Sequence, residues 1–283
     1  MERRLKAAGH RPSLVPDDPR SVGFQGEPGA FSEEAAADLV PGAATRGYLT
    51  FERLIAAVVE AEVDAALLPV ENSIYGTIAP NYDLLWSHPD LRIVDESVFR
   101  VVQTLIGVTG AKLEEIAEVR SHPVALDQCR RLFAAHPAWR RTVVDDTAGA
   151  VREIVAAGDR RVAAIGARSA AERYGAAVLA ENVQDNPDNF TRFFLIGRGG
   201  EARRRLGRAC VALALVDRPG SLRDALSAFA NHRLNLRSLV SRPAPDAGPF
   251  KYRFYCEIEQ AEPAVLAAAL AAIDGESRVL GAY

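Results

Sequence analysis

The apolar run from Asp64 to Val70 constrains the fold of this chain most. Its sequence, DAALLPV, has no polar residue after the aspartate and no alternation between apolar and polar positions. A strand of this kind must be covered on both faces, which is typical of a parallel sheet between helices. In open α/β sheets, ligands bind just beyond the carboxyl ends of the strands. The polar residues at that place are candidate site residues, namely Asn72, Ser73, Gly76 and Thr77.

A strand, a glycine turn and a helix start also occur near the beginning of the chain. Residues 21–24 read as a short strand, the turn is GEPG at 26–29, and Ser32 is placed to cap a helix that runs through Leu39. Such a turn aims free backbone N–H groups at an anion. Its spacing fits neither the dinucleotide motif nor the P-loop, and an ordinary tight turn is the alternative.

Residues 98–184 predict a second α/β lobe. Strands at 119–121, 141–144 and 161–165 alternate with helical segments, and polar loops follow the first two strands. The strand-rich passage at 91–107 and the segment after 181 would each cross between this lobe and a first lobe formed by about 21–97 and 185–198. Two lobes joined twice enclose a cleft. At its edge His122, beside Pro123, is either a structural or a catalytic residue.

The segment NPDNFTRFFLIG at 186–197 leads from a turn into an alternating strand. Thr191, Phe193 and Leu195 fall on one side of this strand, and Arg192 falls on the other. A buried polar group without a partner costs about 1 to 3 kcal/mol, and a charge costs more. Both Thr191 and Arg192 therefore need partners, which for Arg192 could be either a substrate carboxylate or a structural ion pair.

The sequence after residue 207 predicts a separate, smaller domain. Residues 199–207 are rich in glycine and arginine and read as a linker, whereas residues 208–283 show the order βαββαβ of a ferredoxin-like fold. We expect the four-stranded sheet to leave one face and its edges open in a single chain. Residues 1–20 are expected to be a flexible tail.

Composition excludes several classes of protein. The 283 residues carry a net charge of −3, with a pI near 6.0, so no basic surface for nucleic acid is expected. The sequence contains no run of about 18 apolar residues, so no membrane span is predicted. The three cysteines are far apart and have no metal-site spacing, which fits a reducing cytoplasm.

Five blocks in order give the chain a resemblance to the prephenate dehydratases and to the related arogenate dehydratases of plants. The blocks are GFQGEPGAFSE (23–33), LLPVENSIYGTIAPNYDLL (67–85), SHPVALDQC (121–129), DTAGA (146–150) and LAENVQDNPDNFTRFFLIG (179–197). The resemblance implies a two-lobed catalytic domain like that of periplasmic binding proteins, followed by a C-terminal ACT domain. It implies decarboxylating dehydration of prephenate to phenylpyruvate in L-phenylalanine biosynthesis, without a cofactor or metal.

The resemblance also assigns roles to individual residues. The motif Thr-Arg-Phe is intact at Thr191, Arg192 and Phe193, with Thr191 as the catalytic residue. The other substrate-binding candidates are Asn72, Ser73, Thr77, Gly26, Ser32, Ser121, Gln128 and Thr147. The alternatives are an arogenate dehydratase and a non-catalytic amino-acid sensor.

The C-terminal part departs from the family pattern at two regulatory motifs, which read GSLR at 220–223 and VSRP at 240–243. The usual glutamate is replaced by Val240. By resemblance we still expect a homodimer or homotetramer that binds L-phenylalanine as an effector at an interface between copies. The residues expected to contact it are Gly220, Asn235, Leu236 and Ser241.

Overall fold

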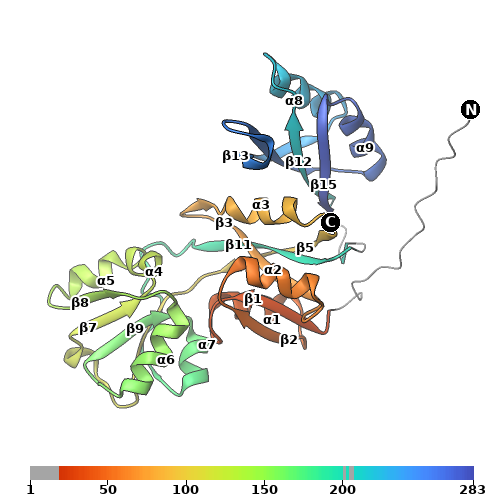
Figure 1. Cartoon of the computed structure of the whole chain (residues 1–283). Helices are drawn as coiled ribbons and strands as arrows, with labels where there is room; N and C mark the ends of the chain where they lie inside the picture. The colour runs from red at the N-terminus through yellow and green to blue at the C-terminus, as the bar shows by residue number, and fades with distance from the viewer. Residues whose placement is uncertain (1–18, 200–201, 204–206) are drawn as a thin grey trace, which may run out of the picture.

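A computed structural model describes residues 19–199, 202–203 and 207–283. Two α/β lobes lie side by side, and a C-terminal domain sits on the first of them (Figure 1). The two-lobed arrangement predicted from the sequence is therefore confirmed. Most of the predicted tail at 1–20 and more than half of the predicted linker at 199–207 lie outside the described residues.

The first lobe is built on a sheet with the strand order β2-β1-β3-β11-β5, to which β4 is added beside β3. The run at 65–70 lies inside β3 and is buried throughout, between a parallel β1 and an antiparallel β11. The strands are β1 (Ser21–Gln25), β2 (Ala44–Tyr48), β3 (Ala65–Asn72), β4 (Gly76–Thr77), β5 (Leu91–Arg100) and β11 (Phe190–Arg198), and the helices are α1 (Phe31–Leu39), α2 (Phe51–Val59) and α3 (Pro80–Ser87).

The second lobe has the strand order β10-β6-β9-β7-β8. The helical segment after Pro123 is divided in two, because the Asp185 carboxylate accepts from the backbone N–H groups of Arg130 and Arg131 and starts a new helix there. The elements are β6 (Thr104–Gly107), η1 (Leu113–Glu115), β7 (Glu118–Ser121), α4 (Pro123–Asp127), α5 (Arg130–Ala135), β8 (Arg140–Val143), α6 (Thr147–Ala157), β9 (Val162–Gly166), α7 (Arg168–Tyr174) and β10 (Ala177–Ala180).

Two crossings join the lobes, one after β5 and one before β11. The first sheet extends to Arg100, because β5 pairs with β11 as far as Phe190, and the second sheet begins at Thr104. The boundary between the lobes thus lies a few residues later than the expected position at 97–98. Since β5 and β11 are neighbours, both crossings leave the first lobe from one edge of its sheet.

The alternation predicted for β11 is confirmed. Phe193 and Leu195 pack with Val22 and Ala35 on one face of the sheet. Phe194 lies in a different cluster, on the opposite face. Thr191 and Arg192, at the start of the same strand, therefore face opposite sides of the sheet.

The C-terminal domain has the predicted βαββαβ order and the antiparallel sheet β13-β14-β12-β15. Its helices cover one face of the sheet. The expectation of an open second face is wrong, because Cys210, Ala212, Tyr255 and Leu280 on that face share one apolar cluster with Tyr82 and Phe194 of the first lobe. The edge strand β13 pairs only with β14 among the described residues. The elements are β12 (Arg208–Leu215), α8 (Ser221–Asn231), β13 (Asn235–Pro243), η2 (Pro245–Ala247), β14 (Tyr252–Glu259), α9 (Pro263–Ala271) and β15 (Gly275–Ala282).

The three cysteines are free and buried. Burial raises the pKa of the Cys129 and Cys256 thiols to about 12, so both are neutral members of the core. Among the residues that the structure describes, no helix is long and apolar enough to cross a membrane.

Candidate functional site

Asn72 and Thr191 face each other from the neighbouring strands β3 and β11. They are partners in the antiparallel register, and Asn72 Nδ2 donates to Thr191 Oγ1 at 3.1 Å. Asn72 Oδ1 accepts from the backbone N–H groups of Ile74 and Tyr75 at 3.0 and 3.1 Å. Because backbone N–H groups can only donate, these bonds determine which end of the amide faces Thr191. The Thr191 oxygen is therefore an acceptor, and its proton must point to another group.

Asn189 connects this pair to the second lobe. It is fully buried, its Oδ1 accepts from Asn72 Nδ2 at 2.9 Å, and its Nδ2 donates to Gln128 Oε1 at 3.0 Å. Gln103, between β5 and β6, donates to the same Gln128 oxygen at 2.9 Å. Gln128 stays a predicted substrate contact, and its carbonyl oxygen accepts from two amide side chains that join the lobes.

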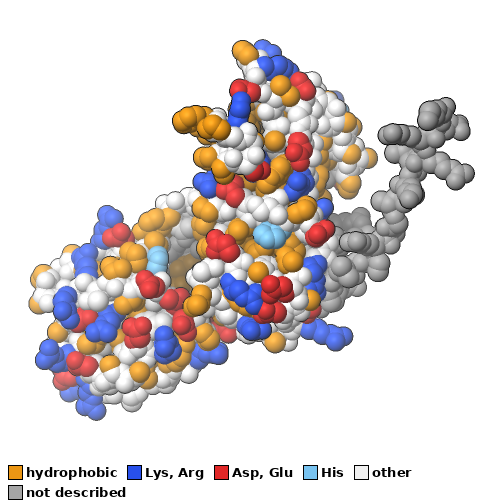
Figure 2. Space-filling view, viewed as in Figure 1, with side chains coloured by type: hydrophobic (Ala, Val, Ile, Leu, Met, Phe, Trp, Pro, Cys, Tyr) orange, Lys and Arg blue, Asp and Glu red, His pale blue; other side chains and the backbone are white. Residues whose placement is uncertain are grey.

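A cavity of about 310 Å³ opens beside these amides. The surface is hollowed between the two lobes in Figure 2. Burial and the charge of Asp127 raise the pKa of the Tyr75 phenol, which is therefore a neutral donor at the cavity wall. Arg130 places a positively charged residue in the wall of the same cavity. The lining residues are Ile74, Tyr75, Asp127, Gln128, Arg130, Asp185 and Asn186.

Ser73 and Ser121 donate to the backbone rather than to the cleft. Ser73 Oγ donates to the carbonyl of Asp188 and accepts from the N–H of Phe190, both at 2.9 Å, so it fastens the loop after β3 to the start of β11. Ser121 is fully buried and donates to the carbonyl of Ile165 at 2.6 Å. A serine has only one proton to donate. The proton of each hydroxyl is thus taken by a backbone carbonyl, and Ser73 and Ser121 stay predicted substrate contacts.

The turn between β1 and α1 is also occupied by groups of the protein itself. The Gly29 N–H, in the turn that could bind an anion, donates to Glu33 Oε2 at 2.5 Å. Helix α1 begins one residue before Ser32, which is therefore not its cap. Gly26 has φ +125°, and a Cβ there would lie 3.2 Å from Asp146 Oδ2. Gly26 thus lets the end of β1 approach the start of α6 in the second lobe.

Arg192 faces the side of the sheet opposite to Thr191, whereas Phe193 shares the side of Thr191 but is buried in the core. Phe193 is 2% exposed in the core of the first lobe. Arg192 donates to both oxygens of Glu257 in the C-terminal domain, at 2.6 and 2.7 Å, and to Glu71 at 3.0 Å. Burial by itself would lower the pKa of Arg192, but the hydrogen bonds to Glu257 and the charge of that carboxylate raise it overall. Of the two alternatives left open for Arg192, the structure thus favours the structural ion pair.

Thr147, Thr77 and His122 are the remaining candidates near the cleft. Thr147 is the first residue of α6, after the capping residue Asp146. Thr77 is exposed in the short strand β4. His122 Nδ1 accepts from the Val124 N–H at 3.3 Å and caps α4, which is a structural role. Thr77 and Thr147 stay predicted substrate contacts.

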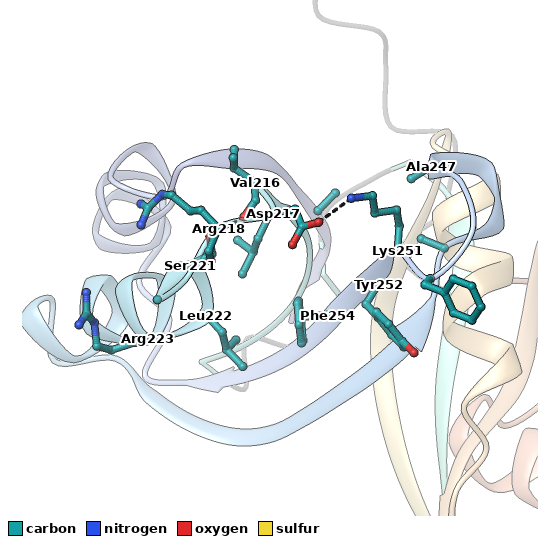
Figure 3. A pocket seen from close by; sticks show the side chains of 15 residues that line it. Val216, Asp217, Arg218, Ser221, Leu222, Arg223, Ala247, Lys251, Tyr252 and Phe254 are labelled. Carbon is teal, nitrogen blue, oxygen red and sulfur yellow. Dashed lines mark hydrogen bonds and ion pairs between the residues drawn. The ribbon is translucent and has the colours of Figure 1, made fainter.

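A second cavity, of about 510 Å³, lies in the C-terminal domain (Figure 3). The turn before α8 and the segment that enters β14 form its walls, and Lys251 Nζ pairs with Asp217 Oδ2 at 2.6 Å between them. Gly220 caps α8 with φ +88°, a conformation that favours glycine. The lining residues are Ala214, Leu215, Val216, Asp217, Arg218, Gly220, Ser221, Leu222, Arg223, Ala244, Ala247, Phe250, Lys251, Tyr252 and Phe254.

The four predicted effector residues do not meet within one chain. Only Gly220 lines the second cavity. Asn235 begins β13 at the far end of the sheet, opposite Glu259, and Leu236 follows it. Ser241 lies opposite Phe254, at the end of β13 next to the cavity.

Three residues at the site, Asn189, Gln103 and Tyr75, were not among the predicted site residues. Asn189 could have been found, because it precedes Thr191 by two residues, and residues two apart in a strand share a face. Because Asn189 follows the turn-forming residues at 186–188, it was assigned to the turn and not to the face of the strand that carries Thr191. Gln103 lies in a passage without clear periodicity, so no pattern singled it out.

Comparisons with known proteins agree with this architecture. The model of the family described as prephenate dehydratase matches residues 22–201, and that of the ACT domain matches residues 212–274. The chain is 39% identical to arogenate dehydratase/prephenate dehydratase 1, chloroplastic, of Arabidopsis thaliana, over 84% of this chain and 64% of the relative. It is 37% identical to arogenate dehydratase 1 of Petunia hybrida, over 93% and 66%. The chain thus spans about two thirds of the length of these plant relatives.

Two solved structures are similar over nearly the whole chain. The prephenate dehydratase from Arthrobacter aurescens, in complex with L-Phe, has a TM-score of 0.83 and 30% identity, covering 93% of this chain and 90% of that one. GqqA, described as a novel type of quorum quenching acylase, has a TM-score of 0.84 and 30% identity, covering 93% and 97%. Because the first family model covers more than half of the chain, this protein belongs to the prephenate dehydratase family and carries a C-terminal ACT domain.

Proposed function

We propose that this protein removes carbon dioxide and water from prephenate to give phenylpyruvate, on the route to L-phenylalanine. The observation that carries the proposal is the Asn72–Thr191 pair, in which Thr191 Oγ1 accepts from the amide at 3.1 Å and keeps its proton for another group. Membership of the family supports the choice of substrate.

Thr191 is assigned to the departing ring hydroxyl of prephenate. The electron pair of the bond to the ring carboxylate moves into the ring as carbon dioxide leaves, and the pair of the C4–O bond leaves with the oxygen, which takes up a proton and departs as water. A threonine hydroxyl is too weak an acid to give up its proton unaided at neutral pH. Thr191 therefore stabilises the developing charge, and a water or a chain of hydroxyls completes the proton transfer.

The substrate also carries two carboxylates, which need donors. Arg192 is occupied by Glu257 and Glu71. Arg130 and Tyr75 line the cavity between the lobes and are the cation and the neutral donor that we assign to one carboxylate. These assignments rest on position in the cavity wall.

The test is turnover of prephenate by the purified protein, measured as formation of phenylpyruvate. We expect turnover, and the values of kcat/KM for prephenate and arogenate then decide between the dehydratase and its arogenate alternative. Because one solved relative is described as an acylase, hydrolysis of an N-acyl amide is the control reaction. Absence of turnover with both prephenate and arogenate would favour the non-catalytic sensor.

We also propose a homodimer or homotetramer that binds L-phenylalanine through its ACT domains. The edge strand β13 offers free backbone groups to a second copy. Antiparallel pairing of two β13 strands would bring Asn235 of one copy beside the Ser241 end of the other, and thus near its Gly220. This pairing would bring the predicted effector residues of two copies toward one another. The relative from Arthrobacter aurescens, described in complex with L-Phe, supports the choice of ligand.

Calorimetric titration with L-phenylalanine is expected to release or absorb heat, with L-alanine as the control ligand. Prephenate turnover is expected to fall as the amino acid binds, because the ACT sheet packs against the catalytic lobe. If millimolar L-phenylalanine produced neither heat nor inhibition, the proposed effector would be refuted. Since the three thiols are unpaired, we place the protein in the reducing cytoplasm, although several of its plant relatives are chloroplastic by name.

A further inference from the structure

Three carboxylates surround the guanidinium of Arg192. Glu257 binds it with both oxygens at 2.6 and 2.7 Å, Glu71 lies at 3.0 Å and Glu96 at 3.7 Å. The side chains of Arg192, Glu257 and Glu96 are 6%, 5% and 2% exposed. Tyr82 donates to Glu257 at 2.7 Å and orients it. The cluster thus joins the ACT sheet to three neighbouring strands of the catalytic lobe.

This cluster lies directly behind the Asn72–Thr191 pair. In the register of β3 and β11, Thr191 is opposite Asn72 and Arg192 is opposite Glu71. Successive side chains of a strand point to opposite faces. Each residue of the site pair is therefore bonded covalently to one residue of the ion pair, and the two pairs lie on opposite faces of the same stretch of sheet.

The backbone pairing of β11 with β3 is interrupted at this point, whereas its pairing with β5 runs without a break from Phe190 to Leu195. Phe193, next to Arg192, has Pro69 as its partner, so Val70 is an extra residue on β3. A bulge leaves the extra residue unpaired and disrupts the ladder, and a proline has no N–H to donate. The ladder between β3 and β11 is therefore short on the Thr191 side of the bulge, and the contacts of Arg192 with Glu71 and Glu257 add to the positioning that β5 supplies there.

We infer that Arg192 is a positioning residue: held by Glu71 and by Glu257 of the ACT domain, it keeps Thr191 against Asn72. The ACT domain thereby supports the catalytic strand through one carboxylate. A misplacement of about 1 Å at a reacting group can cost about a hundredfold in rate. The kinetic consequence of this inference rests on the proposed function, whereas its structural consequence does not.

The interface between the two domains offers a matched control. Asp83 of α3 accepts from Arg242 at 2.7 Å and from the Tyr255 hydroxyl at 2.9 Å, both in the ACT sheet. Asp83→Asn removes a carboxylate from the same interface as Glu257→Gln. Of these two carboxylates, only Glu257 contacts the residue next to Thr191.

The experiment compares these two variants in the full chain by kinetics and by amide hydrogen exchange. For Glu257→Gln we expect kcat for prephenate to fall at least about tenfold with KM changed less than about twofold, because Thr191 is misplaced while binding groups remain. Exchange of the amides at 188–194 should rise about tenfold or more. Asp83→Asn should change neither kcat nor the exchange at 188–194 by more than about twofold. Glu71→Gln, at a side chain 46% exposed, should change both quantities in the same direction as Glu257→Gln but by less, without altering the domain interface.

Equal effects of Glu257→Gln and Asp83→Asn would overturn the inference, because Glu257 would then act only by joining the domains. Unchanged exchange at 188–194 in both Glu257→Gln and Glu71→Gln would also overturn it. If the unmodified protein does not convert prephenate, the proposed function fails, and the exchange comparison alone decides the role of Arg192. If Glu257→Gln does not fold, Glu71→Gln provides the same comparison.

Discussion

Replacing Thr191 by valine is expected to lower kcat for prephenate by about a hundred- to a thousandfold, which corresponds to the roughly 3 to 4 kcal/mol of one positioned donor to developing charge. Valine has the shape of threonine without the hydroxyl. The fold should remain intact, because Asn72 Nδ2 keeps Asn189 Oδ1 and the carbonyl of Phe190 as acceptors, at 2.9 and 3.2 Å. Steady-state kinetics and the circular dichroism of the folded variant are the measurements.

Thr109→Val is the control for this substitution. The Thr109 hydroxyl donates to the carbonyl of Gly175 at 3.1 Å in the second lobe, so the control also removes a hydroxyl with one known partner. Its kcat should stay within about twofold of the unmodified value, because surface substitutions have small effects. Near-normal turnover by folded Thr191→Val would remove Thr191 from the mechanism.

Replacing Arg192 by methionine is expected to lower the free energy of unfolding by about 3 to 5 kcal/mol. Methionine can fill much of the space, but it leaves the buried carboxylate of Glu257 without its bidentate partner. An uncompensated buried charge is the costly part of such a change. Urea denaturation, followed by fluorescence, measures the loss.

Arg242→Met is the matched control, because Arg242 also forms an ion pair between the two domains. The Arg242 and Asp83 side chains are 28% and 31% exposed, so water can solvate the carboxylate that remains. The expected loss is about 1 kcal/mol or less. A similar loss in both variants would contradict the distinct burial of the Arg192 cluster.

Local patterns predicted most of the elements around the site. The apolar run at 65–70 predicted a buried strand, and the alternation after Asn189 predicted which residues of β11 share a face. Both predictions depend only on the direction of successive side chains, which the backbone determines within a few residues.

Hydrogen-bond partners were predicted less well. Polar residues after strand ends were correctly placed at the lobe junction, but Ser73 and Ser121 donate to carbonyls of Asp188 and Ile165 rather than into the cleft. The acceptors lie 115 and 44 residues away in the chain. Neither the spacing nor the composition of the sequence indicates which distant carbonyl a hydroxyl will meet.

The alternation of the sequence was enough to place Thr191 and Arg192 on opposite faces of a buried strand and to show that each needs a partner. The identity of those partners depends on the packing of distant parts of the chain. Asn72 meets Thr191 through strand pairing, and Glu257 meets Arg192 because the ACT sheet packs on the catalytic lobe. The physical reason is that strand alternation is a local property, whereas the neutralisation of a buried charge depends on which distant surface is brought against it.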